Sequence, residues 1–233
     1  MLEIRDLHVR FGQAHILQGV SLSVGARPMA ILGRNGMGKT TLCQAAMGMV
    51  AASAGEIMLD GARLNGLAPF RIARRGIALV PQGRRTFPSL SVDEHLRLVA
   101  RRGARWSIER VYQTFPRLAE RRRNGGTELS GGEQQMLAIA RALLMNPKVV
   151  VMDEPSEGLA PVIVDQLIDV LRALPQDGMG LLLVEQNLRV ATEVADEVAI
   201  MVTGRIAAAM PATQLAGDLG LQRRYLGVAA GGH

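Results

Sequence analysis

The chain has 233 residues, of which 48% are hydrophobic, and a formal net charge of +6. This size and apolar content can bury a full core, so we expect one compact domain over residues 1–233 and no extensive disorder. No apolar run approaches the roughly 20 residues that cross a bilayer, and the charged start lacks the apolar middle of a signal peptide. We therefore expect a cytoplasmic protein, in which the single cysteine, Cys43, is a small core residue.

Arginine supplies almost all of the positive charge, because only Lys39 and Lys148 are lysines. The arginines at positions 71, 74 and 75 and the run at 121–123 have no interleaved aromatic residues on which bases could stack. The sequence therefore favours solvated helix faces for these clusters, and nucleic acid is not an expected partner.

The first part of the chain has strand patterns followed by a loop and a helix. Apolar residues alternate over 2–11 and 16–24, and a short apolar run over 28–33 ends in glycine. The small and apolar residues at 40–50 are typical of a helix, and residues 55–61 return to a strand pattern. This order predicts an antiparallel β lobe that leads into a strand, a loop and a helix.

The second part of the chain alternates strands with helices. Buried strands are predicted at 77–82, 148–154 and 181–186, and helices at 133–145 and 162–174. A helical lobe spans about 83–140, with helical patterns at 92–102 and 108–123, and a hairpin at 197–210 turns at Thr203 and Gly204. The alternation predicts an α/β fold with a parallel sheet that helices cover on both faces. The last five residues are expected to fray.

Residues 33–40, GRNGMGKT, match the phosphate-binding pattern G-x-x-x-x-G-K-[ST] and follow a predicted strand. Glycines allow the backbone N–H groups of such a loop to converge on phosphate oxygens at a helix N-terminus. Lysine supplies a charge for the β- and γ-phosphates, and the first threonine supplies a hydroxyl for Mg²⁺. The predicted nucleotide-binding residues are Gly33, Asn35, Gly36, Gly38, Lys39, Thr40 and Thr41.

Two carboxylates end the predicted strand at 148–154. Asp153 and Glu154 lie at its carboxyl end, which is the edge where open α/β sheets bind ligands. Asp153 suits the Mg²⁺ shell, and Glu154 suits the polarisation of a water that attacks the γ-phosphate.

The segment LSGGEQ at 129–134 resembles the signature motif of ABC ATPases, and the order of the other motifs agrees along essentially the whole chain. The resemblance implies the fold of the P-loop ABC ATPases. It also implies that Phe11 stacks on adenine and that Gln82 lies in a loop that contacts Mg²⁺ and the attacking water. Ser130, Gly131 and Gly132 would then bind the ATP of a partner subunit in a head-to-tail dimer.

Two positions depart from the family pattern. Residues 157–160 read Glu-Gly-Leu-Ala where the family has a loop ending in aspartate, and Gln186 stands where the family has a histidine that reaches the γ-phosphate. Glutamine can donate a hydrogen bond there but carries no charge. Gln186 is therefore assigned, with Glu154 and Gln82, to the catalytic set.

The strings GRNGMGKTT, VPQGRRTFPSL, DEPSEGLAP and LLVEQN together resemble an ATPase subunit of branched-chain amino acid importers. Such a subunit works on the inner face of the cell membrane with permease subunits, a second ATPase chain and, indirectly, an extracytoplasmic binding protein. An importer of urea or short-chain amides is the alternative. An exporter subunit and a soluble ABC ATPase acting on DNA or ribosomes are disfavoured, the latter because the chain has one phosphate loop and no long heptad run.

The histidines and Trp106 are candidates for other roles. His8, His15, His95 and His233 lack the spacing of metal ligands, so no metal site built on histidine is expected. Trp106 fits either a core position or a surface that contacts a membrane subunit.

Overall fold

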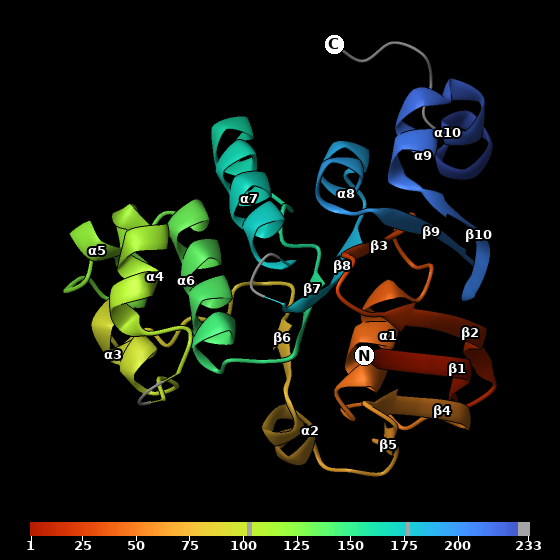
Figure 1. Cartoon of the computed structure of the whole chain (residues 1–233), viewed down its shortest axis with the longest axis horizontal. Helices are drawn as coiled ribbons and strands as arrows, with labels where there is room; N and C mark the ends of the chain where they lie inside the picture. The colour runs from red at the N-terminus through yellow and green to blue at the C-terminus, as the bar shows by residue number, and fades with distance from the viewer. Residues whose placement is uncertain (102–103, 176–177, 228–233) are drawn as a thin grey trace.

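A computed structural model describes residues 1–101, 104–175 and 178–227. Its centre is a six-stranded sheet in the order β10-β9-β3-β8-β7-β6 (Figure 1). All neighbouring strands are parallel except β10, which pairs with β9 as an antiparallel hairpin. The predicted parallel sheet and terminal hairpin are therefore confirmed. The strands are β3 (Met29–Leu32), β6 (Ile77–Val80), β7 (Val149–Asp153), β8 (Gly180–Glu185), β9 (Glu197–Val202) and β10 (Arg205–Pro211).

A second sheet contains the N-terminal strands, as the alternating pattern predicts. It is antiparallel in the order β2-β1-β4-β5. Along the first strand, the alternation of buried and exposed side chains is interrupted between Ile4 and Leu7. The register of strand pairing shifts in the same place, and Asp6 there has a φ of +45°. A bulge of this kind keeps apolar side chains on the core face despite the extra residue. The strands are β1 (Leu2–Phe11), β2 (Ala14–Val24), β4 (Ala54–Leu59) and β5 (Ala62–Arg63).

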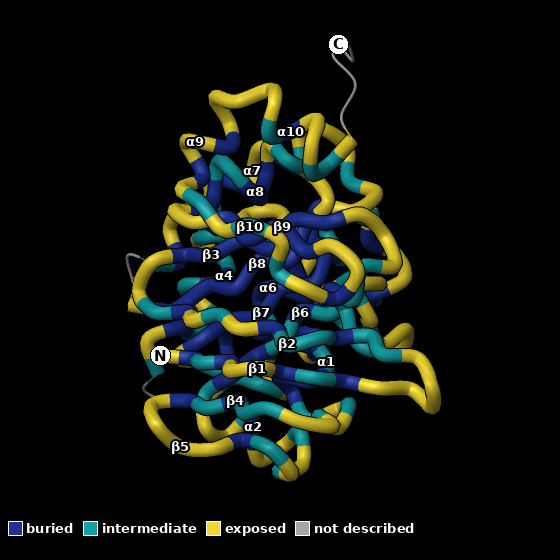
Figure 2. The backbone as a smooth tube through the Cα atoms, turned by 90° about the vertical axis from the view of Figure 1, so that its right-hand side faces the viewer, coloured by how far each residue is buried: buried dark blue, intermediate teal, exposed yellow. Residues whose placement is uncertain are grey.

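The central sheet separates two apolar cores, because successive side chains of a strand point to opposite faces. Ala30 and Leu32 belong to one core, and Met29 and Ile31 belong to the other. One face is covered by α6 (Gly131–Leu144), α7 (Pro161–Ala173) and α8 (Leu188–Val194). The other face is covered jointly by α1 (Lys39–Ala46) and the antiparallel sheet, so the predicted cover of helices is right for the first face and partial for the second. The strands of the central sheet other than the edge strand β10 are buried along most of their length (Figure 2).

The helical lobe packs on α6 and continues the first core. It contains α3 (Val92–Arg97), α4 (Ile108–Thr114), α5 (Pro116–Glu120) and a 3₁₀ turn at Gly126–Glu128 (Figure 1). The single helix predicted at 108–123 is divided at Phe115, because Pro116 lacks an N–H and restricts the residue before it. The helix predicted at 92–102 is shorter and ends at Arg97. Trp106 is 2% exposed, so its position is in the core.

Three helices were not anticipated from the sequence: α2 (Pro69–Arg75), α9 (Ala212–Gly217) and α10 (Leu219–Leu226). The last five residues, which were predicted to fray, lie outside the described residues. Within the described ranges, no helix is both long and apolar enough to cross a membrane.

Candidate nucleotide site

The phosphate loop connects the carboxyl end of β3 to the N-terminus of α1, as the motif requires. Gly38 precedes the helix with a φ of +99°, and a Cβ there would come within 2.9 Å of Leu17 Cδ2. A Cβ on Gly33 would lie 2.7 Å from the carbonyl oxygen of Met201. Only glycine suits these two positions, because one needs a left-handed conformation and the other a close approach of β9.

Lys39 lies inside this loop with 4% of its surface exposed. Its ammonium donates to the carbonyls of Gly33 at 2.8 Å and Arg34 at 3.0 Å, and it pairs with Glu154 Oε1 at 2.9 Å. These three partners use the three donors of the ammonium group. A phosphate oxygen at the loop would therefore compete with Glu154 for Lys39.

Asp153 and Thr40 meet where β7 ends beside the phosphate loop. Thr40 Oγ1 donates to Asp153 Oδ1 at 3.3 Å. Burial raises the pKa of Asp153 and outweighs the hydrogen bond from Thr40, which lowers it. The two oxygen ligands predicted for Mg²⁺ therefore lie side by side, and the carboxylate has a poorly solvated charge that a cation would stabilise.

Glu154 is the centre of a polar network. It is 7% exposed and has a φ of +50°, which is a strained conformation for a residue with a side chain. Its Oε1 pairs with Lys39, and its Oε2 accepts a hydrogen bond from Gln186 Nε2 at 2.7 Å. The same Gln186 amide also donates to Asn35 Oδ1. Gln186 thus joins the phosphate loop to the acidic strand end, in the place where the family has histidine.

A hollow of about 470 Å³ brings most of the predicted residues together. Phe11 lies at its rim and is 52% exposed, which leaves its ring free to stack on a base. Ile16 lines the same hollow and was missed by sequence reasoning, since an apolar residue on a strand gives no signal of ligand contact. The lining residues are Phe11, Ile16, Asn35, Gly36, Gly38, Lys39, Thr40, Thr41, Gln82 and Glu154.

Gln82 reaches this hollow from the end of β6 and is bound to the loop after the acidic pair. Its Nε2 donates to Glu157 Oε2 at 2.6 Å. Arg84 donates to the carbonyl oxygens of Glu157 and Gly158, both at 3.4 Å. Glu157, one of the residues that depart from the family pattern, therefore connects two loops that the sequence alone does not relate.

The signature residues begin α6 and are not among the residues that line the hollow. Ser130 caps this helix: its hydroxyl accepts from Glu133 N at 3.3 Å, and Glu133 Oε2 accepts from Ser130 N at 2.8 Å. Ser130 is exposed, and Gly131 and Gly132 are partly exposed. Their predicted contact with the ATP of a partner subunit stays a prediction.

His95 and Cys43 have structural surroundings. His95 accepts from Phe87 N at 2.8 Å and contacts the carbonyl of Ser91 at 2.8 Å, and burial lowers its pKa. Cys43 is buried, which raises the pKa of its thiol and confirms the core assignment. Among the described residues, no group of three or more histidine, cysteine or acidic side chains could hold a metal ion, and His233 lies outside those residues.

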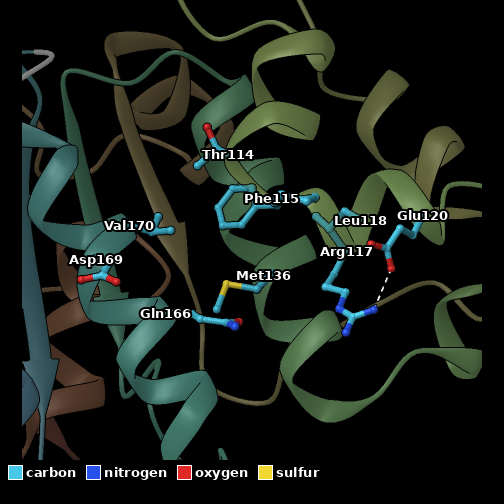
Figure 3. Close-up of a pocket in the computed structure, with 10 residues that line it drawn as sticks. Thr114, Phe115, Arg117, Leu118, Glu120, Met136, Gln166, Asp169 and Val170 are labelled. Atoms are coloured by element: carbon cyan, nitrogen blue, oxygen red, sulfur yellow. Dashed lines mark hydrogen bonds and ion pairs between the residues drawn. The ribbon is translucent and has the colours of Figure 1, made fainter.

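A second hollow of about 420 Å³ lies between the helical lobe and α7 (Figure 3). Phe115 and Leu118 from the lobe, Met136 from α6 and Val170 from α7 supply its apolar walls, and Arg117 pairs with Glu120 at its rim at 2.8 Å. The residues that line it include neither a glycine nor a lysine, unlike those of the phosphate loop. The hollow at the sheet edge, which the phosphate loop lines, is therefore the candidate nucleotide site.

Comparisons with known proteins point to one family. A family model described as ABC transporter matches residues 17–157. The branched-chain amino acid transport ATP-binding protein BraG of Pseudomonas aeruginosa is 38% identical, over 88% of this chain and 91% of its own length. The lipopolysaccharide export ATP-binding protein LptB of Haemophilus influenzae is 32% identical, over 97% of each chain. A solved ATP-binding subunit of an ABC transporter superposes with a TM-score of 0.82 at 28% identity, over 95% of this chain and 94% of that one.

Proposed function

Because the chain belongs to the ABC transporter family of ATP-binding subunits, we propose that it powers an importer for branched-chain or other hydrophobic amino acids. The observation that supports the ATPase chemistry most strongly is the network of Lys39, Glu154 and Gln186 at the phosphate loop. The amino acid specificity is supported by the similarity to BraG, together with the VEQN and DEPSEGLAP segments.

In the proposed reaction, the loop amides and Lys39 bind the phosphates while Phe11 stacks on the adenine. Glu154 accepts the proton of the water that attacks the γ-phosphate, and Gln186 donates a hydrogen bond beside it. The water oxygen forms the new bond to phosphorus as the bond to the β-phosphate oxygen breaks. ADP leaves with the electron pair of the broken bond.

Thr40, Asp153 and Gln82 are the proposed residues around Mg²⁺, which when bound would offset negative charge on the phosphates. The pair formed by Thr40 Oγ1 and Asp153 Oδ1 supports the first two assignments. Gln82 contacts Glu157 in the structure, so a role at the metal would require its side chain to leave that carboxylate.

The proposed assembly consists of two ATPase chains bound to permease subunits at the inner face of the membrane. The chain forms one ABC ATPase domain over residues 1–233, with the helical lobe at about 83–140. Ser130, Gly131 and Gly132 bind the nucleotide of the second ATPase chain, so that two nucleotides are enclosed. An extracytoplasmic binding protein delivers the solute, and nucleic acid has no part.

Substitution of the two lysines tests the ATPase assignment. Lys39→Ala should weaken ATP binding and abolish measurable hydrolysis, because it removes a direct phosphate partner. Lys148→Ala is a matched control. This lysine is exposed and pairs with Asp60, and neither residue lines the hollow at the phosphate loop. Isothermal titration with ATP, with thermal unfolding of both variants, measures the difference. Equal ATP affinities in the two variants would contradict the assignment.

The solute is tested by reconstituting this chain in vesicles with the proposed permease subunits and binding protein. Leucine-loaded binding protein should stimulate ATP hydrolysis and leucine uptake. Stimulation by urea or a short amide instead would favour the alternative importer. Outward release of lipid without solute uptake would favour an exporter. The similarity to LptB supports this specific alternative.

A further inference from the structure

Glu185 is a buried carboxylate that the proposed chemistry does not use. It is the last residue of β8 and is 2% exposed, less than Asp153 at 3% or Glu154 at 7%. Burial raises its pKa, and the hydrogen bonds that it accepts oppose this effect. A carboxylate is expensive to bury unless it is well hydrogen-bonded, so its partners reveal what it does.

The two oxygens of Glu185 bind two different loops. Oε1 accepts from the backbone N–H of Ser156 at 3.0 Å. Oε2 accepts from the backbone N–H groups of Gln186 at 3.1 Å and Asn187 at 3.2 Å. Ser156 is two residues beyond Glu154, and Gln186 follows Glu185 directly. One side chain therefore joins the loop of the proposed base to the loop of its hydrogen-bond partner.

Both loops leave the sheet side by side. Strands β7 and β8 are parallel, with Asp153 opposite Val184, and Glu154 N donates to the carbonyl of Val184 at 2.8 Å. This backbone contact fixes the start of the acidic loop, and Glu185 fixes its next turn. The 2.7 Å contact between Gln186 Nε2 and Glu154 Oε2 then spans the gap between the two fixed backbones.

We infer that Glu185 is a positioning residue for ATP hydrolysis, whose carboxylate holds the loops of Glu154 and Gln186 at the spacing that their hydrogen bond requires. This inference rests on the proposed function, since it assumes that Glu154 acts on the attacking water. A glutamine at 185 has one acceptor oxygen, and its NH₂ group would face an N–H donor on one of the two loops. One loop would then lose its anchor, although shape and volume would hardly change.

A double-mutant cycle with Gln186 tests this role in the full-length chain. Glu185→Gln should lower kcat by about 2- to 12-fold, no more than Gln186→Ala does, with ADP affinity changed by less than about twofold. In a Gln186→Ala background, Glu185→Gln should change kcat by less than about twofold, because no contact is left for Glu185 to position. Glu193→Gln is the control, since this carboxylate on α8 pairs with Arg172 and Arg189 instead.

Fully additive losses of kcat, or an unchanged kcat in a folded Glu185→Gln variant, would overturn the inference. If that variant does not fold, Glu185→Asp replaces it in the same cycle, because the shorter carboxylate keeps the charge but cannot reach both loops. Failure of the proposed function gives a separate pattern, in which Glu154→Gln hydrolyses ATP as fast as the wild type.

Discussion

The nucleotide edge of the central sheet and the helical lobe bury different kinds of side chain, charged at the edge and apolar in the lobe. At the edge, Lys39, Asp153 and Glu154 are almost fully buried. Lys39 forms an ion pair with Glu154, and Asp153 accepts a hydrogen bond from Thr40. In the lobe, Val111, Leu118 and other apolar side chains fill the space. A change at the edge should therefore alter ATP chemistry first, whereas a change in the lobe core should alter stability first.

The largest expected effect is at the edge. Glu154→Gln should keep ATP binding but lower the rate of hydrolysis by about 10²- to 10⁴-fold, because an amide cannot accept the proton of water. Phosphate release and the binding of a fluorescent ATP analogue measure the two effects. Glu120→Gln in the lobe, where the carboxylate pairs with Arg117 at the surface, is the control. Hydrolysis at the wild-type rate would show that a residue other than Glu154 accepts the proton of the attacking water.

The second effect is in the lobe. Leu118 is fully buried, so Leu118→Ala should lower the free energy of unfolding by about 2–5 kcal/mol through lost burial and a cavity. Leu98 is 64% exposed, and Leu98→Ala should change the free energy of unfolding by no more than about 0.5 kcal/mol. Urea unfolding measures both. A large loss of ATP affinity in folded Leu118→Ala would break the contrast between lobe and edge.

A smaller effect is expected at the rim of the nucleotide hollow. Phe11→Ala should weaken ATP binding by about 1–3 kcal/mol if the ring stacks on adenine. Phe70 has a similar exposure, 57% against 52%, but it lies on α2 outside the hollow. Phe70→Ala should therefore leave ATP affinity unchanged in the same titration. Equal ATP affinities of the Phe11→Ala and Phe70→Ala variants would show that Phe11 does not stack on adenine.

The smallest effect is expected at Gln186. Gln186→Ala should reduce turnover by about 2- to 12-fold, because a neutral hydrogen bond contributes about 0.5–1.5 kcal/mol. ADP affinity should hardly change, since ADP has no γ-phosphate. ATPase activity of the permease-bound complex and ADP titration measure the two. Equal losses of ATP and ADP affinity would show a general structural role, and wild-type turnover would show that Gln186 takes no part in hydrolysis.

Features that depend on neighbouring residues could be predicted from the sequence alone. The phosphate loop is eight consecutive residues between a strand and a helix, and Asp153 with Glu154 end a fully apolar strand. Such patterns predict their structure because local backbone conformation and strand polarity are set within a few residues. The same holds for the alternation that predicts the parallel sheet. Pro116 is also a local signal, because a proline interrupts a helix, but the prediction of one helix over 108–123 does not take it into account.

The contacts between polar groups from distant segments depend on the tertiary fold. Gln186 contacts Glu154 and Asn35, which are 32 and 151 residues away in the sequence, and Gln82 contacts Glu157 at a separation of 75. Ile16 enters the nucleotide hollow from a strand of the other sheet. The pairing of β7 with β8 brings Ser156 to Glu185. Strand order and register fix these contacts, and both depend on how distant segments pack together, which spacing along one chain does not encode.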